Sequence, residues 1–278
     1  MSDEVGATAV PERVDNYIRS GARRVRGWLD PGAAKLIAEL GSNQSSHGAV
    51  GEIGVHHGKL FLLLDLLRRP GEASVAIDLF EEQHLNVDHS GHGDRQMFEA
   101  NLARHSAGPS TVEIRTADST TLSSDDLLAW GKGPYRLFSV DGGHTAGITA
   151  HDLRIASEAL EPTGLLILDD YFNGAWPGVS EGTCRFMATS PDLEAVGSGF
   201  NKMFFARPGA AEGYRQQMRR VAAGQRWKLI EHEFFGSPHL VVQRRRRVQI
   251  LKRAGRKLVE RVPLIHNAAR TLKRRLRR

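Results

Sequence analysis

Apolar residues follow two different spacings in turn along the chain, and this alternation predicts an α/β fold. Short, nearly continuous apolar runs are typical of buried parallel strands, whereas apolar positions three or four residues apart are typical of helices. The strand-like runs lie at 49–55, 73–79, 111–116, 136–140 and 164–168, and the helix-like patterns at 59–69, 94–105, 122–130 and 148–160. Strands joined by helices in this way form a parallel sheet that is covered on both faces.

Two regions flank this alternation. Residues 11–40 have apolar positions at helical spacing around a Pro-Gly turn, which predicts helices before the first strand. After residue 195, two further strands are predicted at 202–206 and 239–243. Together with the five earlier runs they predict a Rossmann-like α/β fold, with a mostly parallel sheet of seven strands flanked by helices.

The composition is ordinary for a soluble protein, but the charge is distributed unevenly, with a strongly basic C-terminal tail. The 278 residues are 40% hydrophobic and 25% charged, and the single cysteine, Cys184, excludes an internal disulfide. Residues 244–278 hold 15 basic side chains and one acidic side chain, whereas the rest of the chain holds 23 basic and 31 acidic ones. An acidic body argues against nucleic-acid binding. With neither a signal-peptide pattern nor a long apolar run, we expect a cytoplasmic protein.

The basic tail has apolar positions at helical steps from Leu251 onward, with an interruption near Pro263. As a basic amphipathic helix it would lie on an anionic membrane surface, dock on the acidic body or pair with another subunit; a solvated charge run is the simpler alternative. We therefore expect three parts: an N-terminal helical cap over 1–44, one domain over 45–243 and the tail over 244–278. We also expect a homo-oligomer that associates through the N-terminal helices.

A glycine-bearing turn after the first predicted strand is the strongest sign of a ligand site. Gly54 and Gly58 allow the backbone to approach a ligand closely, and the helix that follows offers free N–H groups. Asp78 ends the second apolar run, where a carboxylate can accept hydrogen bonds from both hydroxyls of a ribose. The two features together predict a nucleotide-type cofactor.

Acidic residues also follow the next three apolar runs. They are Asp118, Asp141 and the pair Asp169 and Asp170. Each one alone could be a turn former, but parallel strands bring their carboxyl ends to one edge of the sheet, where ligands bind. Adjacent carboxylates repel each other unless a cation lies between them, and oxygen ligands favour Mg²⁺ or another hard divalent ion over zinc. Asp141, Asp169 and Asp170 are therefore the predicted metal ligands.

His144 lies three residues after Asp141 and could reach the same point. Its ordinary pKa of about 6.5 suits a general base at neutral pH, although a solvated loop histidine is the simpler alternative. The polar segment 81–95 contains three histidines but no cysteine, and their spacing is irregular. We therefore interpret it as a mobile lid rather than as a zinc site.

On these motifs, residues 45–243 resemble the class I S-adenosylmethionine-dependent methyltransferases, and among them the metal-dependent sugar O-methyltransferases of the mycinamicin and novobiocin type. The motifs are Glu-Ile-Gly-Val-His-His-Gly-Lys, Ala-Ile-Asp-Leu-Phe, Val-Asp-Gly-Gly-His and Leu-Asp-Asp-Tyr-Phe. The resemblance implies that S-adenosylmethionine is held by Glu52, Gly54, Gly58, Asp78, Asp118, Ser119 and Asp141, that Mg²⁺ or another hard cation is held by Asp141, Asp169 and Asp170, and that His144 is the base. One departure is His56, which stands where the family has the middle glycine of its first motif.

The family implies methyl transfer to a sugar hydroxyl of a small-molecule or oligosaccharide acceptor, such as a mannoside in polysaccharide biosynthesis. The metal would chelate two neighbouring hydroxyls while His144 removes a proton. Tyr171, Asn173 and Trp176 could contact the acceptor, or their segment could pack beneath its loop. Catechol-type methylation of an aromatic diol stays open, as does a non-catalytic protein that the tail recruits to membrane or nucleic acid. The acidic body disfavours an RNA methyltransferase.

Overall fold

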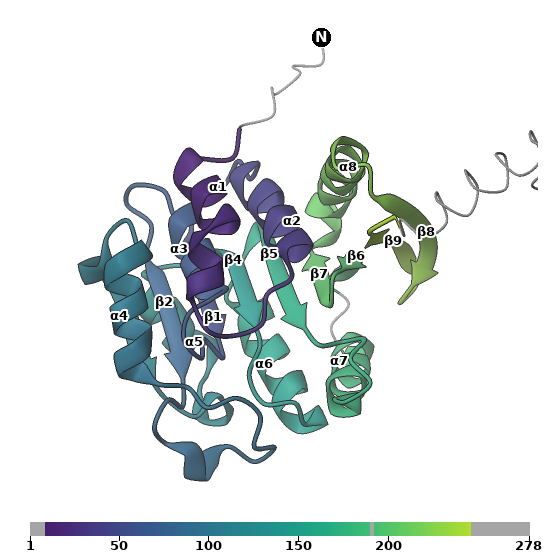
Figure 1. Cartoon of the computed structure of the whole chain (residues 1–278). Helices are drawn as coiled ribbons and strands as arrows, with labels where there is room; N and C mark the ends of the chain where they lie inside the picture. Colours follow the sequence, from purple (N-terminus) through teal and green to yellow (C-terminus); the bar gives the residue numbers. More distant parts are fainter. Residues whose placement is uncertain (1–8, 190–191, 246–278) are drawn as a thin grey trace, which may run out of the picture.

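The computed structural model describes residues 9–189 and 192–245, which form one central sheet with helices on both faces (Figure 1). Within this part of the chain the sheet has nine strands in the order β3-β2-β1-β4-β5-β7-β6-β9-β8. The strands are β1 (Ala49–Ile53), β2 (Ser74–Asp78), β3 (Val112–Thr116), β4 (Tyr135–Val140), β5 (Leu160–Asp169), β6 (Glu194–Gly199), β7 (Lys202–Ala206), β8 (Lys228–Phe234) and β9 (Ser237–Gln243). The predicted helix of the basic tail, from Leu251 onward, lies outside the described residues.

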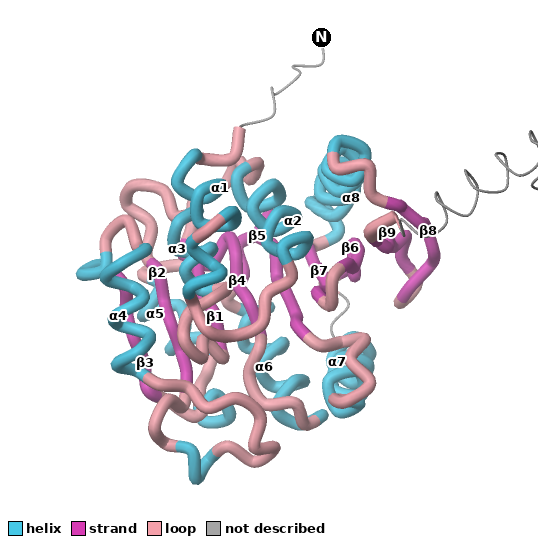
Figure 2. The backbone as a smooth tube through the Cα atoms, viewed as in Figure 1, coloured by secondary structure: helices cyan, strands magenta, loops and turns pink. Residues whose placement is uncertain are grey.

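Eight α-helices accompany the sheet in the described ranges. They are α1 (Glu12–Arg19), α2 (Pro31–Ser42), α3 (Phe61–Leu67), α4 (Arg95–His105), α5 (Ser124–Gly131), α6 (Ala146–Glu158), α7 (Pro177–Thr189) and α8 (Pro208–Gly224). Among the described residues, none of these helices is long and apolar enough to cross a bilayer. Figure 2 shows that loops join them to the strands at both ends of the sheet.

Side chains that alternate along the strands build one core on each face of the sheet. Val50 of β1 and Phe204 of β7 belong to the core beneath α1, α2, α3, α4 and α8. Ile53 of β1 and Phe205 of β7 belong to the opposite core, beneath α5, α6 and α7. Because α1 and α2 share the first core with the sheet, the N-terminal helices are packed on the domain. Association of subunits through them stays a prediction.

The central strands β3, β2, β1, β4 and β5 are all parallel, as predicted. Strand order reverses beside β1, because the chain runs outward through β2 and β3 on one side and through β4 and β5 on the other. A reversal of this kind opens a crevice at the carboxyl ends of the strands.

The expected count of seven strands is corrected to nine. β6 contains Gly197 and Gly199, and glycine usually indicates a turn. Here a Cβ at Gly197 would overlap the carbonyl oxygen of Leu240 in the neighbouring strand β9, and Met218 of α8 also packs against it. β8 is an edge strand with mostly exposed polar side chains, so it lacks the apolar run of a buried strand. α7 and α8 were also absent from the prediction.

Candidate active site

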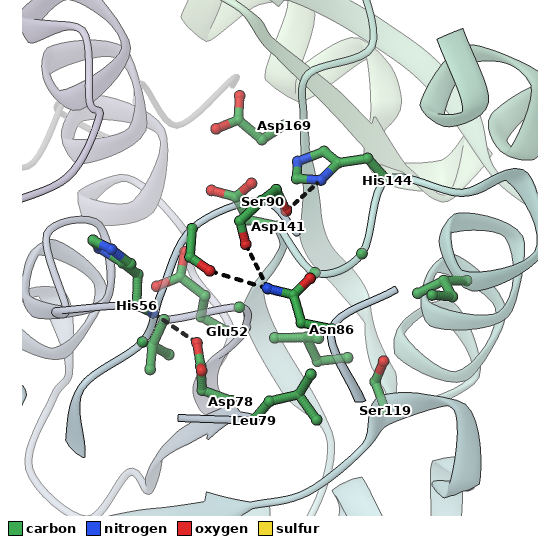
Figure 3. Close-up of a pocket in the computed structure, with 18 of the residues that line it drawn as sticks. Glu52, His56, Asp78, Leu79, Asn86, Ser90, Ser119, Asp141, His144 and Asp169 are labelled. Carbon is green, nitrogen blue, oxygen red and sulfur yellow. Dashed lines mark hydrogen bonds between the residues drawn. The ribbon is translucent and has the colours of Figure 1, made fainter. Parts of the chain in front are cut away.

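A pocket of about 510 Å³ lies at the carboxyl ends of the central strands, beside the point where the strand order reverses (Figure 3). The predicted site residues that line it are Glu52, Gly54, Asp78, Asp118, Ser119, Asp141, His144, Asp169, Asp170, Asn173 and Trp176. The fold therefore brings most of the site residues that the sequence predicted into one cavity.

Two predicted site residues lie outside the pocket lining. Gly58 has a φ of 89°, and a side chain there would overlap the ring of Phe98. Its role is thus to let α4 pack closely. Tyr171 is 8% exposed and packs edge-on against Phe234. It occupies the core beneath its loop, which is the alternative that the sequence left open.

The turn after β1 owes its shape to Gly54. Its φ of 86° lies in the left-handed region, and a Cβ there would overlap the carbonyl oxygen of Asp141. His56 has a φ of 51°, so it adopts the conformation that glycine favours. Histidine is among the residues that are enriched in this region, which explains how it can replace the usual glycine.

Hydrogen bonds to Asp78 hold this turn against the end of β2. The two carboxylate oxygens of Asp78 accept hydrogen bonds from the backbone N–H groups of His56 (Figure 3) and Phe80, each at 2.7 Å. Burial raises the pKa of Asp78, and the two N–H groups offset part of that effect. Each carboxylate oxygen keeps a lone pair for a ribose hydroxyl. This geometry supports the predicted cofactor role of Asp78.

Asp118 and Ser119 form the wall of the pocket beyond β3. The Asp118 side chain caps a short 3-10 helix (Ser119–Thr121) by accepting from the backbone N–H of Thr120 at 2.9 Å. Asp152 of α6 lies behind them and is fully buried. Burial raises its pKa to about 7, and the hydroxyl of Ser119 offsets only part of this.

Asp152 should make the stability of the protein depend on pH. Its folded-state pKa of about 7 exceeds the ordinary 3.8, so folding favours its protonated form and stability falls as pH rises from about 4 to about 7. Asp152→Asn should therefore raise the free energy of unfolding at pH 8 by about 1–4 kcal/mol and change it little at pH 4. Urea unfolding at both pH values measures this. Asp125→Asn, on the exposed first turn of α5, is the control; equal effects of both variants would contradict the prediction.

Three further groups lie close enough to share a divalent cation. One ligand atom from each of Asp141, His144 and Asp170 lies within 4.8 Å of the others. Burial and the neighbouring carboxylate of Asp169 raise the pKa of Asp141 well above its usual range. The pKa of Asp170 is lowered to about 2, because hydrogen bonds from His144 and Asn173 outweigh its burial. The two carboxylates therefore fit a hard divalent cation, with the imidazole of His144 beside it.

Asp169 has a different partner. Its carboxylate forms an ion pair with the ammonium of Lys202, a residue of β7 that is 3% exposed. Lys202 also lies 3.7 Å from a carboxylate oxygen of Asp141. Burial lowers the pKa of Lys202, but the carboxylates of Asp169 and Asp141 raise it by more. The sequence analysis missed this residue, although a charged residue that begins the apolar run 202–206 was an available signal.

His144 is held by a loop that the sequence predicted as a lid. Asp88 in that loop accepts a hydrogen bond from the backbone N–H of His144 at 2.5 Å, and the same oxygen lies 3.0 Å from His144 Nδ1. The hydroxyl of Ser90 lies 3.0 Å from the same nitrogen (Figure 3). On its other side Nε2 lies 3.3 Å from Asp170, and the ring stacks on Trp176 with centroids 4.4 Å apart.

These contacts set the chemistry of the imidazole. Burial lowers the pKa of His144, but hydrogen bonding to Asp170 and the charge of Asp88 raise it by more. Hydrogen bonds from Ser90 and from the backbone of His144 outweigh burial and lower the pKa of Asp88, so its carboxylate is ionised. An ionised Asp88 beside Nδ1 favours a proton on that atom, so Nε2, which faces Asp170 and the pocket, is the nitrogen that gives up or takes up a proton. Asp88 was not singled out from the sequence, because its partner is 56 residues away.

The comparisons agree with this architecture. Residues 52–171 match a family model described as a methyltransferase domain. A putative O-methyltransferase from Klebsiella pneumoniae aligns with a TM-score of 0.50 and 16% identity, covering 71% of this chain and 90% of that one. At this identity the likeness concerns the fold, and it confirms the predicted Rossmann-like class.

Two further solved structures are similar in part. CalS11, a TDP-rhamnose 3'-O-methyltransferase of calicheamicin biosynthesis, has a TM-score of 0.47 and 14% identity over 72% of this chain and 88% of that one. TomG from Streptomyces achromogenes, which is involved in tomaymycin synthesis, has a TM-score of 0.44 and 15% identity over 84% and 88%. No curated protein matches the sequence.

Proposed function

We propose that this chain transfers a methyl group from S-adenosylmethionine to a sugar hydroxyl in a metal-dependent reaction; the match of residues 52–171 to a methyltransferase domain and the Rossmann-like fold support this. The observation that carries this proposal is the arrangement around His144. A histidine oriented by a carboxylate faces two further carboxylates, Asp141 and Asp170, in the same pocket as the cofactor residues. A base beside a cation site is what activation of a hydroxyl requires.

In the proposed reaction, separate groups of residues bind the cofactor, hold the cation and take up the proton. S-adenosylmethionine supplies an electrophilic methyl group on its sulfonium, and Asp78 together with the Gly54 turn would hold its ribose and methionine parts. A divalent cation held by Asp141 and Asp170 would supply positive charge that lowers the pKa of an acceptor hydroxyl. His144 Nε2 takes the hydroxyl proton, while Asp88 holds Nδ1–H and stabilises the imidazolium that forms.

Polar side chains in the pocket lining support a sugar as the acceptor. Asn86, Ser90 and Asn173 are among the lining residues, and amide and hydroxyl groups of this kind can exchange hydrogen bonds with sugar hydroxyls. Trp176 presents an aromatic ring next to His144, and aromatic faces pack well on sugar rings. Under this proposal the acceptor is a saccharide or glycoside, with a mannoside of polysaccharide biosynthesis as one example.

An aromatic diol is the second candidate acceptor. Trp28 is 80% exposed and Val87 62% exposed, and both line the pocket mouth together with Leu85. Apolar side chains in this position would pack against an aromatic ring. Assays with a panel of sugars and with catechols, using the same radiolabelled methyl donor, separate the two acceptors.

Titration calorimetry tests the cofactor and metal sites independently. We expect the wild type to bind S-adenosylhomocysteine and then Mg²⁺. Asp78→Ala should weaken binding of S-adenosylhomocysteine by about 10- to 100-fold, because charge-assisted hydrogen bonds are lost, and should leave Mg²⁺ binding in place. Asp170→Asn should do the reverse. A folded wild type that does not bind S-adenosylhomocysteine would refute the methyltransferase proposal, and binding without Mg²⁺ affinity would refute its metal dependence.

A further inference from the structure

Lys202 is a buried cation among the carboxylates of the active site. It belongs to β7, which runs antiparallel to β5, and it pairs directly with Asp169 in the register of the two strands. Directly paired residues project to the same face of a sheet, so the ion pair follows from the register. Glu52 at the end of β1 is also buried, and its charge acts on Lys202.

We propose that Lys202 is a positioning residue that commits Asp169 to an internal ion pair, so that Asp141 and Asp170 are the two carboxylates that bind the divalent cation. This inference rests on the metal dependence of the proposed function. It changes the ligand set that the sequence predicted, in which Asp169 was a third metal ligand.

The contacts of Asp169 support this assignment. One of its oxygens pairs with Lys202, and the other accepts hydrogen bonds from the backbone N–H of Asp170 at 2.9 Å and from the Asn201 amide at 3.2 Å. Both oxygens are therefore engaged by donors of the chain itself. A metal ion at Asp169 would have to displace an ammonium group that is shielded from solvent.

Asp170 is oriented differently, although it is the next residue. Its φ of 62° turns the chain there, so that its carboxylate leaves in another direction from that of Asp169. Asn173 and Asn201 donate to Oδ1, whereas Oδ2 faces His144 Nε2 across the pocket. Two carboxylates with the acceptor and water completing the shell are a common arrangement for Mg²⁺.

Mn²⁺ titration of the protein loaded with S-adenosylhomocysteine tests the assignment by calorimetry, without any turnover. Asp169→Asn should keep the Mn²⁺ dissociation constant within about threefold of the wild type, whereas Asp170→Asn should weaken it by about 30-fold or more. Lys202→Met removes a neighbouring positive charge and frees Asp169, so it should tighten Mn²⁺ binding by about tenfold. A purely structural lysine would not produce tighter binding.

Two further variants serve as controls for this experiment. The double variant Asp169→Asn with Lys202→Met removes both members of the ion pair, so it leaves no unpaired buried charge and serves if Lys202→Met alone does not fold. It should bind Mn²⁺ with the affinity of the wild type. Lys35→Met is the matched control, because Lys35 pairs with Asp15 and Glu39 away from the pocket, and it should change nothing.

The outcomes separate this inference from the proposed function. Equal loss of Mn²⁺ binding in Asp169→Asn and Asp170→Asn would overturn the inference and leave the metal-dependent function standing. A wild type that binds S-adenosylhomocysteine but not Mn²⁺ would overturn both. Tighter binding in Lys202→Met, together with an unaffected Asp169→Asn, supports the assignment.

Discussion

Replacing His144 by alanine is expected to lower kcat for methyl transfer by about 10²- to 10⁴-fold at neutral pH, the usual contribution of a general base. The reason is geometric: Nε2 is the nitrogen that faces the carboxylate pair, and its orientation is fixed by Asp88 and by stacking on Trp176. Single-turnover rates with a sugar acceptor measure the chemical step directly.

Binding measurements must accompany this rate. The affinity of His144→Ala for S-adenosylhomocysteine should stay within a few-fold of the wild type, because the cofactor contacts lie on the other side of the pocket. His47→Ala is a matched control, since His47 also lies 3.6 Å from a carboxylate, that of Glu72, but its side chain is 73% exposed. If His144→Ala kept a wild-type rate, another group would have to take the proton and the proposed mechanism would be wrong.

Gly54→Ala is expected to lower the free energy of unfolding by about 2–4 kcal/mol and to abolish binding of S-adenosylhomocysteine. Two costs combine at this position. The φ of 86° is strained for any side chain, and the new Cβ would overlap the carbonyl oxygen of Asp141. Relief of the overlap would separate the turns that follow β1 and β4, which together form the floor of the pocket.

Gly71→Ala separates these two costs. Gly71 has a φ of 85°, nearly the same as Gly54, but a Cβ there would meet no atom within 4 Å. It should therefore show the backbone cost alone, about 1 kcal/mol. Urea denaturation of both variants gives the difference. Similar losses in both would mean that the turns can separate at no cost, contrary to the close packing described above.

Much of the site could be predicted because its residues follow strands. Asp78, Asp141 and Asp170 each come at or directly after the end of a parallel strand, and parallel strands end at a common edge. The apolar runs that locate these strands are a strong local signal. The same reasoning could not place Tyr171, because the left-handed conformation of Asp170 redirects the chain and turns that side chain into the core.

The partners of these residues could not be predicted, since they depend on contacts between distant segments. Lys202 meets Asp169 through the register of β7 on β5, and that register is set by packing on both faces of the sheet. Asp88 meets His144 through a loop with little regular structure. Hydrophobic periodicity carries no information on either contact.

The contact between Asp88 and His144 has a consequence for the order of events in a catalytic cycle. Asp88 belongs to the segment 81–95, in which Gly93 packs against Asp78, the predicted ribose ligand. Under the proposed function, a loop movement that uncovers Asp78 would also take Asp88 away from His144. The loop therefore couples the orientation of the base to the closure of the cofactor site.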